Sequence, residues 1–308
     1  MHIFVTGASG WVGHGLVPDL IAAGHTVAGL ARTDAAARAV QGMGAKPVPG
    51  TLDDLETLRA AAADADGVIH LAFRHDIAFA GDYLGATDTD RAAITALGET
   101  LAGSDRPLVI ASGILGVLGL PPGTVATERD GSPDAGEGPI SGGNGRIANA
   151  HYVLALAEQS VRSSVVRLPP ATHGDGDNGF VATAVGRARD TGAAVYVGDG
   201  TNRWPAVHRN DAARLFRLAL EAAPAGSVLH AVGDEGVPIR DVATAIAVGL
   251  DLPVRSVTAE EAGAHLGWLA GFWATDGPAS AQLTRELLGW QPAGPRLIED
   301  LRQGHYFR

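Results

Sequence analysis

Three glycines near the amino end restrict the fold of this chain more than any other feature. They stand at Gly7, Gly10 and Gly13, directly after a β-branched run and at the start of an alanine-rich helical segment. In this G-x-x-G-x-x-G spacing the first glycine permits a tight turn, the second lets the backbone approach a pyrophosphate, and the third packs helix against strand. The helix N-terminus then turns amide groups and a positive dipole end toward the phosphates. The motif predicts a dinucleotide site in the first βα turn.

The pattern around these glycines predicts an α/β fold. Up to residue 112, short β-branched runs alternate with alanine-rich helical segments. Such alternation implies right-handed βαβ crossovers and a parallel sheet, and strands that are apolar throughout indicate helices on both faces. The predicted strands cover residues 3–6, 26–30, 46–48, 67–71, 108–112 and 164–168, and the predicted helices cover 12–23, 35–43, 55–63, 86–102 and 147–160. We therefore expect a Rossmann-type, doubly wound parallel sheet.

The second part of the chain is less regular. Residues 113–145 are rich in glycine and proline and are predicted to form a long loop. Beyond residue 168, helices are expected near 180–190, 210–222, 239–249 and 279–288, with strands near Val195 and Val228. We predict a dinucleotide-binding domain over residues 1–168 and a smaller C-terminal α/β substrate lobe over residues 169–308, interwoven with the first.

Composition excludes several kinds of partner and site. The formal net charge of −11 disfavours nucleic acid and anionic membranes, and no stretch approaches the roughly 20 apolar residues that a transmembrane helix needs. The chain has no cysteine, which removes disulfides, thiolate zinc sites and cysteine nucleophiles. The amino end forms a strand and a glycine loop rather than a signal peptide. We expect a cytoplasmic protein that acts on a small molecule and binds no nucleic acid, membrane or metal.

The residue after the second predicted strand bears on the choice of cofactor. An acidic side chain there would accept hydrogen bonds from the adenine ribose 2′-hydroxyl and favour NAD. Here Ala31 is followed by Arg32, which can pair with a 2′-phosphate, while Asp34 is expected to cap the next helix. We predict NADP(H); the alternative is that Arg32 is an ordinary surface charge.

Further motifs extend over nearly the whole chain. They are Thr6–Gly13, Gly67–Ala72, Val165–Pro170, Val207–Ala212 and Leu288–Pro292. Together they resemble the extended short-chain dehydrogenases/reductases, also described as the NAD-dependent epimerase/dehydratase family, in which dimerisation through two helices is common. The resemblance implies that the fourth strand passes beside the cofactor ribose and that the backbone after the sixth approaches the nicotinamide. It implies a cofactor site formed by Gly7, Ser9, Gly10, Trp11, Val12, Gly13, Arg32, Leu52, Leu71, Ala72, Phe73 and Pro169.

The chain departs from this family where catalysis is expected. Family members use a Tyr-x-x-x-Lys pair after a Ser or Thr, because the lysine lowers the tyrosine pKa and holds the ribose. The single lysine is Lys46, near the third strand, so this pair cannot form. When the later helix is aligned on Glu158, Ala150 takes the tyrosine position and Leu154 the lysine position. The chain therefore resembles atypical members without the pair, among them antibiotic-pathway ketoreductases, in which hydride transfer needs a correctly placed nicotinamide and carbonyl.

Candidate catalytic side chains follow the fourth and fifth strands and lie on the later helix. Ser112 ends the fifth strand, at the edge where ligands bind in open α/β sheets, although Ile114 is an alternative for the family serine position. His151 and Tyr152 replace the usual catalytic turn, and either could donate a proton. His75 follows the fourth strand and has a pKa suited to acid–base chemistry, with a plain surface role as the alternative.

The second part of the chain supplies further candidates for substrate contacts. Residues 172–179 resemble a calcium loop but lack its final glutamate, so we expect a substrate-side turn with His173 lining the pocket. Arg203 and Trp204 match a segment that meets substrate in relatives, where Trp204 would stack on a flat ligand or lie buried. The aromatic residues of 268–273 would either cover a large apolar substrate or pack the lobe.

These features predict an NADP(H)-dependent reductase that transfers hydride to a carbonyl of a small or polycyclic molecule, such as a polyketide. A nucleotide-sugar epimerase or dehydratase is one alternative, but it would need the tyrosine that Ala150 replaces. A non-catalytic NADP(H)-binding sensor is the other, because loss of the catalytic pair is what such a protein would show.

Overall fold

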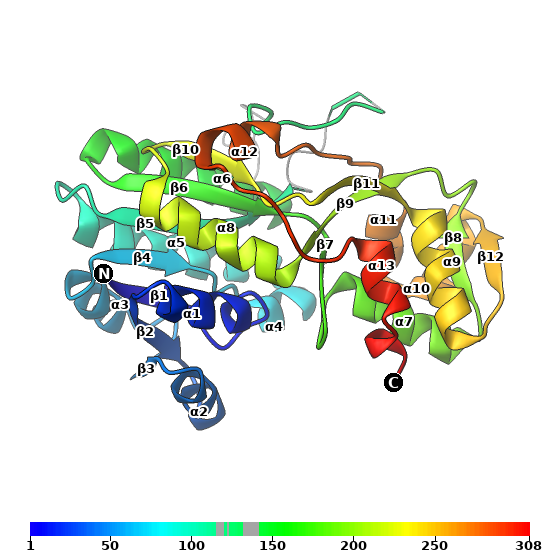
Figure 1. Ribbon diagram of the computed structural model, residues 1–308, viewed down its shortest axis with the longest axis horizontal. Coiled ribbons are helices and arrows are strands. Elements are labelled where there is room, and N and C mark those ends of the chain that lie inside the picture. Colours follow the sequence, from blue (N-terminus) through cyan, green and yellow to red (C-terminus); the bar gives the residue numbers. More distant parts are fainter. Residues whose placement is uncertain (115–119, 122, 132–141) are drawn as a thin grey trace.

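The computed structural model describes residues 1–114, 120–121, 123–131 and 142–308. Its main feature is a seven-stranded sheet with the order β10-β6-β5-β4-β1-β2-β3 (Figure 1). The strands are β1 His2–Thr6, β2 Thr26–Ala31, β3 Lys46–Pro49, β4 Gly67–His70, β5 Pro107–Gly113, β6 Arg162–Leu168 and β10 Ser227–His230. Every pair in this sheet is parallel. The strand order reverses between β1 and β4, which makes this point the expected ligand crevice of a doubly wound sheet. The Rossmann-type fold predicted from the sequence is confirmed.

Helices cover both faces of the sheet (Figure 1). One face is covered by α1 Gly13–Ala22, α2 Asp34–Gly42 and α8 Arg209–Ala222. The other face is covered by α3 Leu55–Ala63, α5 Tyr83–Leu101 and α6 Gly142–Ala155. The short helix α4 His75–Phe79 follows β4. Successive residues of β1 enter different cores, Ile3 and Val5 on the α1 side and Phe4 on the α5 side. Burial on both faces explains why the strands are apolar throughout rather than alternating.

A lobe lies beside the sheet (Figure 1), and its buried apolar residues form a separate core. It contains a three-stranded sheet of β7 Ala171–His173, β9 Arg203–His208 and β11 Asp234–Pro238, and a pair formed by β8 Ala194–Val197 and β12 Val254–Val257. Its helices are α7 Phe180–Thr191, α9 Ile239–Leu250, α10 Ala259–Leu266, α11 Ala270–Trp273 and α13 Leu297–Arg302, while α12 Gln282–Leu288 lies beside β10. Because α8 and β10 return to the main sheet, the predicted boundary after residue 168 divides the chain but not the sheet.

The start of α6 differs from the prediction. The helix begins at Gly142, inside the segment 113–145 that was expected to be a loop, so this part of the prediction is wrong. Residues 115–119, 122 and 132–141 of that segment lie outside the described residues. Glycine is a poor helix former, but here it allows close packing of α6 on α5. A Cβ at Gly145 would lie 2.7 Å from Thr87 Oγ1.

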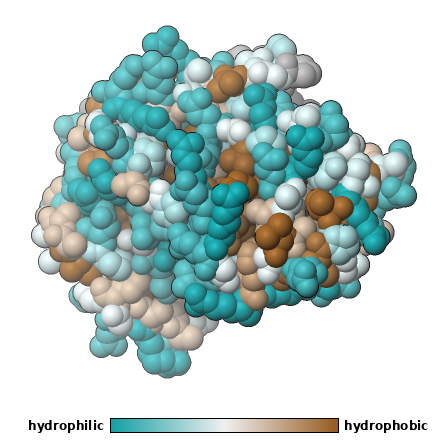
Figure 2. Space-filling model, turned by 45° about the vertical axis from the view of Figure 1, so that its right-hand side comes forward, coloured by the Kyte–Doolittle hydropathy of each residue, from teal (hydrophilic) through white to brown (hydrophobic). Residues whose placement is uncertain are grey.

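The surface is mainly polar on the face that Figure 2 shows, with hydrophobic residues in small groups between hydrophilic ones. Among the described residues, the exposed large apolar side chains include Val248 and Trp268. No helix in the described part of the chain combines the length and apolarity that crossing a bilayer requires.

Candidate functional site

The glycine loop after β1 is shaped to receive a phosphate. Gly7 adopts φ +70°, and a Cβ on it would lie 2.8 Å from the amide nitrogen of Ala72. A Cβ on Gly13 would overlap the carbonyl oxygen of Gly7. Helix α1 starts after Val12 without a side-chain cap and without an acidic residue in its first turn. Its amide groups and positive dipole end are therefore not neutralised by the helix itself, which fits the pyrophosphate of a dinucleotide.

A chain of buried polar side chains fixes the sheet edge beside this loop. We call Thr6, His70, Asp90 and Asn149 the buried polar chain. Thr6 Oγ1 lies 2.8 Å from His70 Nδ1, His70 Nε2 lies 3.0 Å from Asp90 Oδ1, and Asn149 Nδ2 donates to Asp90 Oδ2 at 2.9 Å. The amide of Ala72 donates to Thr6 Oγ1 at 3.3 Å. The chain thus links the ends of β1 and β4 to α5 and α6.

The surroundings of Asp90 favour its ionised form. Burial alone would raise the pKa of Asp90, but the hydrogen bond and charge of His70, the charge of Arg146 and the hydrogen bond from Asn149 together hold that pKa below its ordinary value. The two carboxylate oxygens of Asp90 have different partners, His70 Nε2 at Oδ1 and Asn149 Nδ2 at Oδ2, so both are satisfied. Sequence reasoning missed Asp90 and Asn149. The available signal was a carboxylate among the alanines of a helix that covers the sheet.

Arg146 is the other residue that the sequence did not single out. It lies in the first half of α6, where its guanidinium stands 4.4 Å from the ring centroid of Phe73 and donates from Nη2 to the carbonyl of Ala111 at 3.2 Å. The guanidinium therefore sits between the ends of β4 and β5. Desolvation lowers the pKa of His75, and the positive charge of Arg146 lowers it further. The lysine position of the resembled family falls at Leu154, two turns further along the same helix.

The predicted catalytic side chains are spread along this edge. Ser112 is buried at the end of β5, directly after Ala111 and in register with Arg167 of β6. His151 lies near Arg167, since a Cβ on Gly131 would be 3.4 Å from Arg167 Nη2 and 4.0 Å from His151 Nε2. The ring of Tyr152 instead packs against α5, with the Arg91 guanidinium 3.8 Å from its centroid. The structure thus brings Ser112 beside the strand carbonyl that Arg146 contacts.

Ala150 and Leu154, at the expected positions of the tyrosine and the lysine, both contribute to the core between the sheet and α5. Ile114, the alternative to Ser112, is 1% exposed. The α6 face that carries the catalytic pair in the resembled family is therefore used here for packing.

The lobe meets the glycine loop at Trp11. The indole Nε1 of Trp11 donates to the carbonyl of Thr172 in β7 at 2.8 Å, and the Arg209 guanidinium lies 4.3 Å from the Trp11 ring centroid. A Cβ on Gly176, in the turn before α7, would lie 3.8 Å from the same ring. The predicted cofactor residue Trp11 therefore contacts the lobe directly.

An aromatic cluster begins directly after that turn. Phe180 opens α7, and its ring centroid lies 5.3 Å from that of Trp268 and 5.3 Å from that of Phe272. Trp268 is 50% exposed and Phe272 is 36% exposed. We call these three residues the lobe aromatic cluster. It places flat apolar surface on the lobe at the start of the helix that follows the Gly176 turn.

Three predicted substrate residues take other positions. His173 is fully buried and bonded through Nδ1 to Asp300 at 2.8 Å, and it lines a cavity of about 850 Å³ formed by β9, β11 and residues 290–296. Trp204 is 1% exposed in the lobe core, so its indole is not placed to stack on a ligand. Arg203 pairs with Asp276 at 3.3 Å. Among the described residues that line this cavity, none belongs to the predicted cofactor site.

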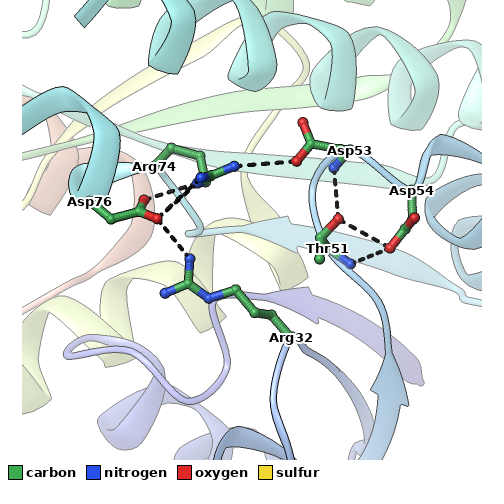
Figure 3. Close-up of polar contacts among 6 residues, drawn as sticks. All are labelled: Arg32, Thr51, Asp53, Asp54, Arg74 and Asp76. Atoms are coloured by element: carbon green, nitrogen blue, oxygen red, sulfur yellow. Dashed lines mark hydrogen bonds and ion pairs between the residues drawn. The ribbon is translucent and has the colours of Figure 1, made fainter. Parts of the chain in front are cut away.

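Arg32 belongs to a set of exposed charges at the other end of the edge (Figure 3). Arg32 Nη1 lies 3.1 Å from Asp76 Oδ2, Arg74 Nε donates to Asp76 Oδ1 at 2.9 Å, and Arg74 Nη1 lies 3.3 Å from Asp53 Oδ2. We call these four residues the ion-pair chain. It joins the segments that follow β2, β3 and β4.

The remaining cofactor candidates lie around the same edge. Leu52, just before Asp53, is buried, Leu71 and Ala72 are half-buried after β4, and Pro169 is buried after β6. Ser9 is half-buried in the glycine loop. The predicted helix cap is corrected: the Thr33 hydroxyl, rather than Asp34, accepts the Ala36 amide at 3.2 Å and caps α2.

Comparison with known proteins identifies similar proteins over all or most of the chain. A family described as NAD(P)H-binding matches residues 7–121. An uncharacterised protein of Schizosaccharomyces pombe is 44% identical over 307 residues, and the alignment covers 100% of both chains. A 4-hydroxy-2-methyl-3-oxo-4-farnesyl-3,4-dihydroquinoline-1-oxide ketoreductase of Stigmatella aurantiaca is 29% identical over 274 residues, which is 87% of this chain and 80% of that protein.

A solved structure supports the fold independently. The dTDP-glucose 4,6-dehydratase of Streptomyces venezuelae with NAD and TYD bound aligns with a TM-score of 0.78 at 19% identity, covering 100% of this chain and 97% of that one. The chain therefore has a Rossmann-type fold, and its first part, residues 7–121, matches a family described as NAD(P)H-binding. At 44% identity over the full length, it belongs to the same family as the fission-yeast protein.

Proposed function

We propose that this protein is an NADP(H)-dependent reductase that transfers hydride to a carbonyl group, of the atypical type that works without a Tyr-Lys pair. The uncapped glycine loop and the family match support a nicotinamide cofactor. A relative at 29% identity is named as a ketoreductase, which supports the reaction class. Arg32 after β2, where an acid would favour NAD, supports the phosphorylated cofactor.

The observation that carries this proposal is the position of Arg146. Its guanidinium lies between Phe73 after β4 and Ala111 of β5, at the sheet edge where ligands bind in this fold. A fixed cation at that edge can stabilise negative charge that develops on a carbonyl oxygen as it is reduced. It would thus take over an electrostatic role that the missing lysine cannot fill.

The chain's own residues have separate parts in this reaction. A bound nicotinamide cofactor supplies the hydride. Arg146 and the Ser112 hydroxyl hold the carbonyl oxygen of the substrate, and the buried polar chain keeps the ends of β1 and β4 in place behind them. His75, whose pKa is lowered, is largely neutral at pH 7 and donates a hydrogen bond or relays a proton to the oxygen.

The lobe aromatic cluster indicates the kind of substrate. Phe180, Trp268 and Phe272 present partly exposed rings directly after the turn that contacts Trp11. Aromatic side chains of this kind bind flat apolar rings by stacking and by area burial. We therefore propose a polycyclic or aryl ketone, or a quinone, rather than a nucleotide sugar.

The test is NADPH oxidation with a panel of aryl ketones, quinones and nucleotide sugars. We expect ketone-dependent turnover, a drop in kcat of about 100-fold for Arg146→Met, and partial recovery for Arg146→Lys. Arg59→Gln, which removes an exposed guanidinium of α3, serves as the charge-matched control and should leave kcat unchanged. Tight NADPH binding without turnover on any ketone or quinone would favour a sensor. An unchanged kcat in Arg146→Met would remove Arg146 from the mechanism.

A further inference from the structure

We propose that Asp76 determines cofactor specificity by acting as an internal counter-anion that holds Arg32 and Arg74 where the 2′-phosphate of NADP(H) binds. The inference rests on the proposed function, because it takes NADP(H) as the ligand. It adds Arg74 as a second phosphate-binding residue and gives Asp76 the role of the group that the phosphate replaces.

The sheet topology places this ion pair over the cofactor edge. Arg32 follows β2 and Asp76 follows β4, and these two strands flank β1 on opposite sides. Neighbouring strands lie about 4.8 Å apart, so the pair crosses about 10 Å of sheet edge. The strand that it crosses is the one that ends in the glycine loop. In Figure 3, Arg32 rises from its own loop to meet Asp76 and Arg74 on the opposite side. The ion pair therefore spans the start of the dinucleotide site.

The charges of this group match a phosphate monoester. The Asp76 carboxylate receives Arg74 through two nitrogens, Nε at 2.9 Å and Nη2 at 3.2 Å, and Arg32 through Nη1 at 3.1 Å. One carboxylate thus sits between two guanidiniums. Paired guanidiniums are the usual ligands for a phosphate group, which carries nearly two negative charges at neutral pH. The Asp76 carboxylate accepts from the same Arg32 and Arg74 donors but carries only one negative charge.

Asp76 is ionised under all ordinary conditions. The hydrogen bond from Arg74 is the main cause that lowers the pKa of Asp76, to about 2, with Arg32 adding to the effect. Protonation therefore does not release the arginines near neutral pH. A competing anion has to do so.

The group is accessible enough for such an exchange. The side chains of Arg32 and Asp76 are 59% and 45% exposed, and that of Arg74 is 26% exposed. Exposed ion pairs contribute little net free energy, so a dianionic ligand can displace the carboxylate. On its far side Arg74 also reaches Asp53, whose turn is closed by Thr51 and Asp54: the Thr51 amide donates to Asp54 Oδ2 at 2.7 Å (Figure 3). Arg74 thus stays over the site when Asp76 leaves.

Loss of the Asp76 charge should therefore favour NADPH selectively. The test measures dissociation constants for NADPH and NADH by calorimetry, together with those of adenosine 2′,5′-bisphosphate and 5′-AMP as probes of the phosphate alone. For Asp76→Asn we expect the NADPH and bisphosphate constants to fall about fivefold, as expected for removal of one competing surface ion pair. The NADH and 5′-AMP constants should change by less than about twofold.

Two further variants complete the test. Asp88→Asn removes one exposed carboxylate of α5 and should leave all four constants unchanged, which separates local contact from net charge. Arg74→Gln should weaken NADPH and the bisphosphate about tenfold while sparing NADH. If Asp76→Asn instead weakens NADH, Asp76 binds the ribose hydroxyl and the inference is wrong. An unchanged NADPH-to-NADH ratio in both variants also overturns it. Failure of the unaltered protein to bind either cofactor would reject the proposed function itself.

Discussion

Two groups of four polar side chains connect the strand ends of this protein, and they differ in nearly every physical respect. The buried polar chain runs from Thr6 to Asn149 beneath the glycine loop, and its members are at most 7% exposed. The ion-pair chain lies over the outer end of the same edge, where the side chains of Arg32 and Asp53 are 59% and 61% exposed. One chain is enclosed by α5 and α6, and the other faces solvent.

The difference in burial gives the two groups different roles. A buried and fully satisfied hydrogen-bond chain resists rearrangement, because breaking one link leaves a polar group without a partner in a medium of low polarity. An exposed ion pair contributes little net free energy to folding, so a ligand can readily replace one of its partners. The buried polar chain therefore positions the site, while the ion-pair chain adjusts which cofactor it accepts.

The largest expected effect comes from cutting the buried polar chain. Asp90→Ala leaves His70 and Asn149 without their shared acceptor, and we expect the free energy of unfolding to fall by about 3 kcal/mol. Urea unfolding followed by far-ultraviolet circular dichroism measures this change. Asp90→Asn, which keeps an acceptor for His70, should lose less. Equal losses in the two variants would mean that packing rather than hydrogen bonding matters at this position.

A smaller effect is expected in the acid dependence of stability. The pKa of Asp90 is lowered in the folded protein from its ordinary value of 3.8, so its ionisation stabilises the fold above that pH. This contribution is lost as pH falls below 3.8 toward the folded pKa. Between pH 5 and pH 3, the free energy of unfolding should therefore depend less steeply on pH in Asp90→Asn than in the unaltered protein. A parallel pH dependence in both proteins would contradict the assignment of Asp90 as a buried carboxylate.

The smallest expected effect is that of Asp76 on stability. Asp76→Ala should change the free energy of unfolding by less than about 1 kcal/mol, because the ion pair that it breaks is solvent-exposed. The same urea titration measures it beside Asp90→Ala. A loss as large as that of Asp90→Ala would remove the contrast between the two groups.

The sequence predicted the sheet well and the site only in part. The strands from β1 to β6 were recognised because burial on both faces makes them short apolar runs between helical segments, and Gly7 and Gly13 marked the loop because their positions exclude a Cβ. The start of α6 was missed because glycine propensity opposed a helix that tertiary packing requires at Gly145. Strands β9 and β11 were missed because they contain proline and charged residues in place of the short apolar run that marks the strands of the main sheet.

The side chains of the site were harder to predict than the backbone. Arg32 was singled out because its place after β2 is fixed by the strand, whereas its pairing with Asp76 depends on how the segment after β2 packs against α4. Arg146 was not predicted because the Tyr-x-x-x-Lys spacing places the expected cation at Leu154, which packs in the core. Trp204 and His173 were expected near substrate, but their burial depends on how the lobe folds around them.

The most direct test of the account is a calorimetric titration of the unaltered protein with NADPH and with NADH. Trp11 lies in the glycine loop, so tryptophan fluorescence provides a second signal for the same event. The account predicts that both cofactors bind, that NADPH binds more tightly, and that the preference for NADPH shrinks at high salt because arginines carry it. Absence of binding by either cofactor would contradict the assignment of the site. Tighter binding of NADH would contradict the role given to Arg32 and Arg74.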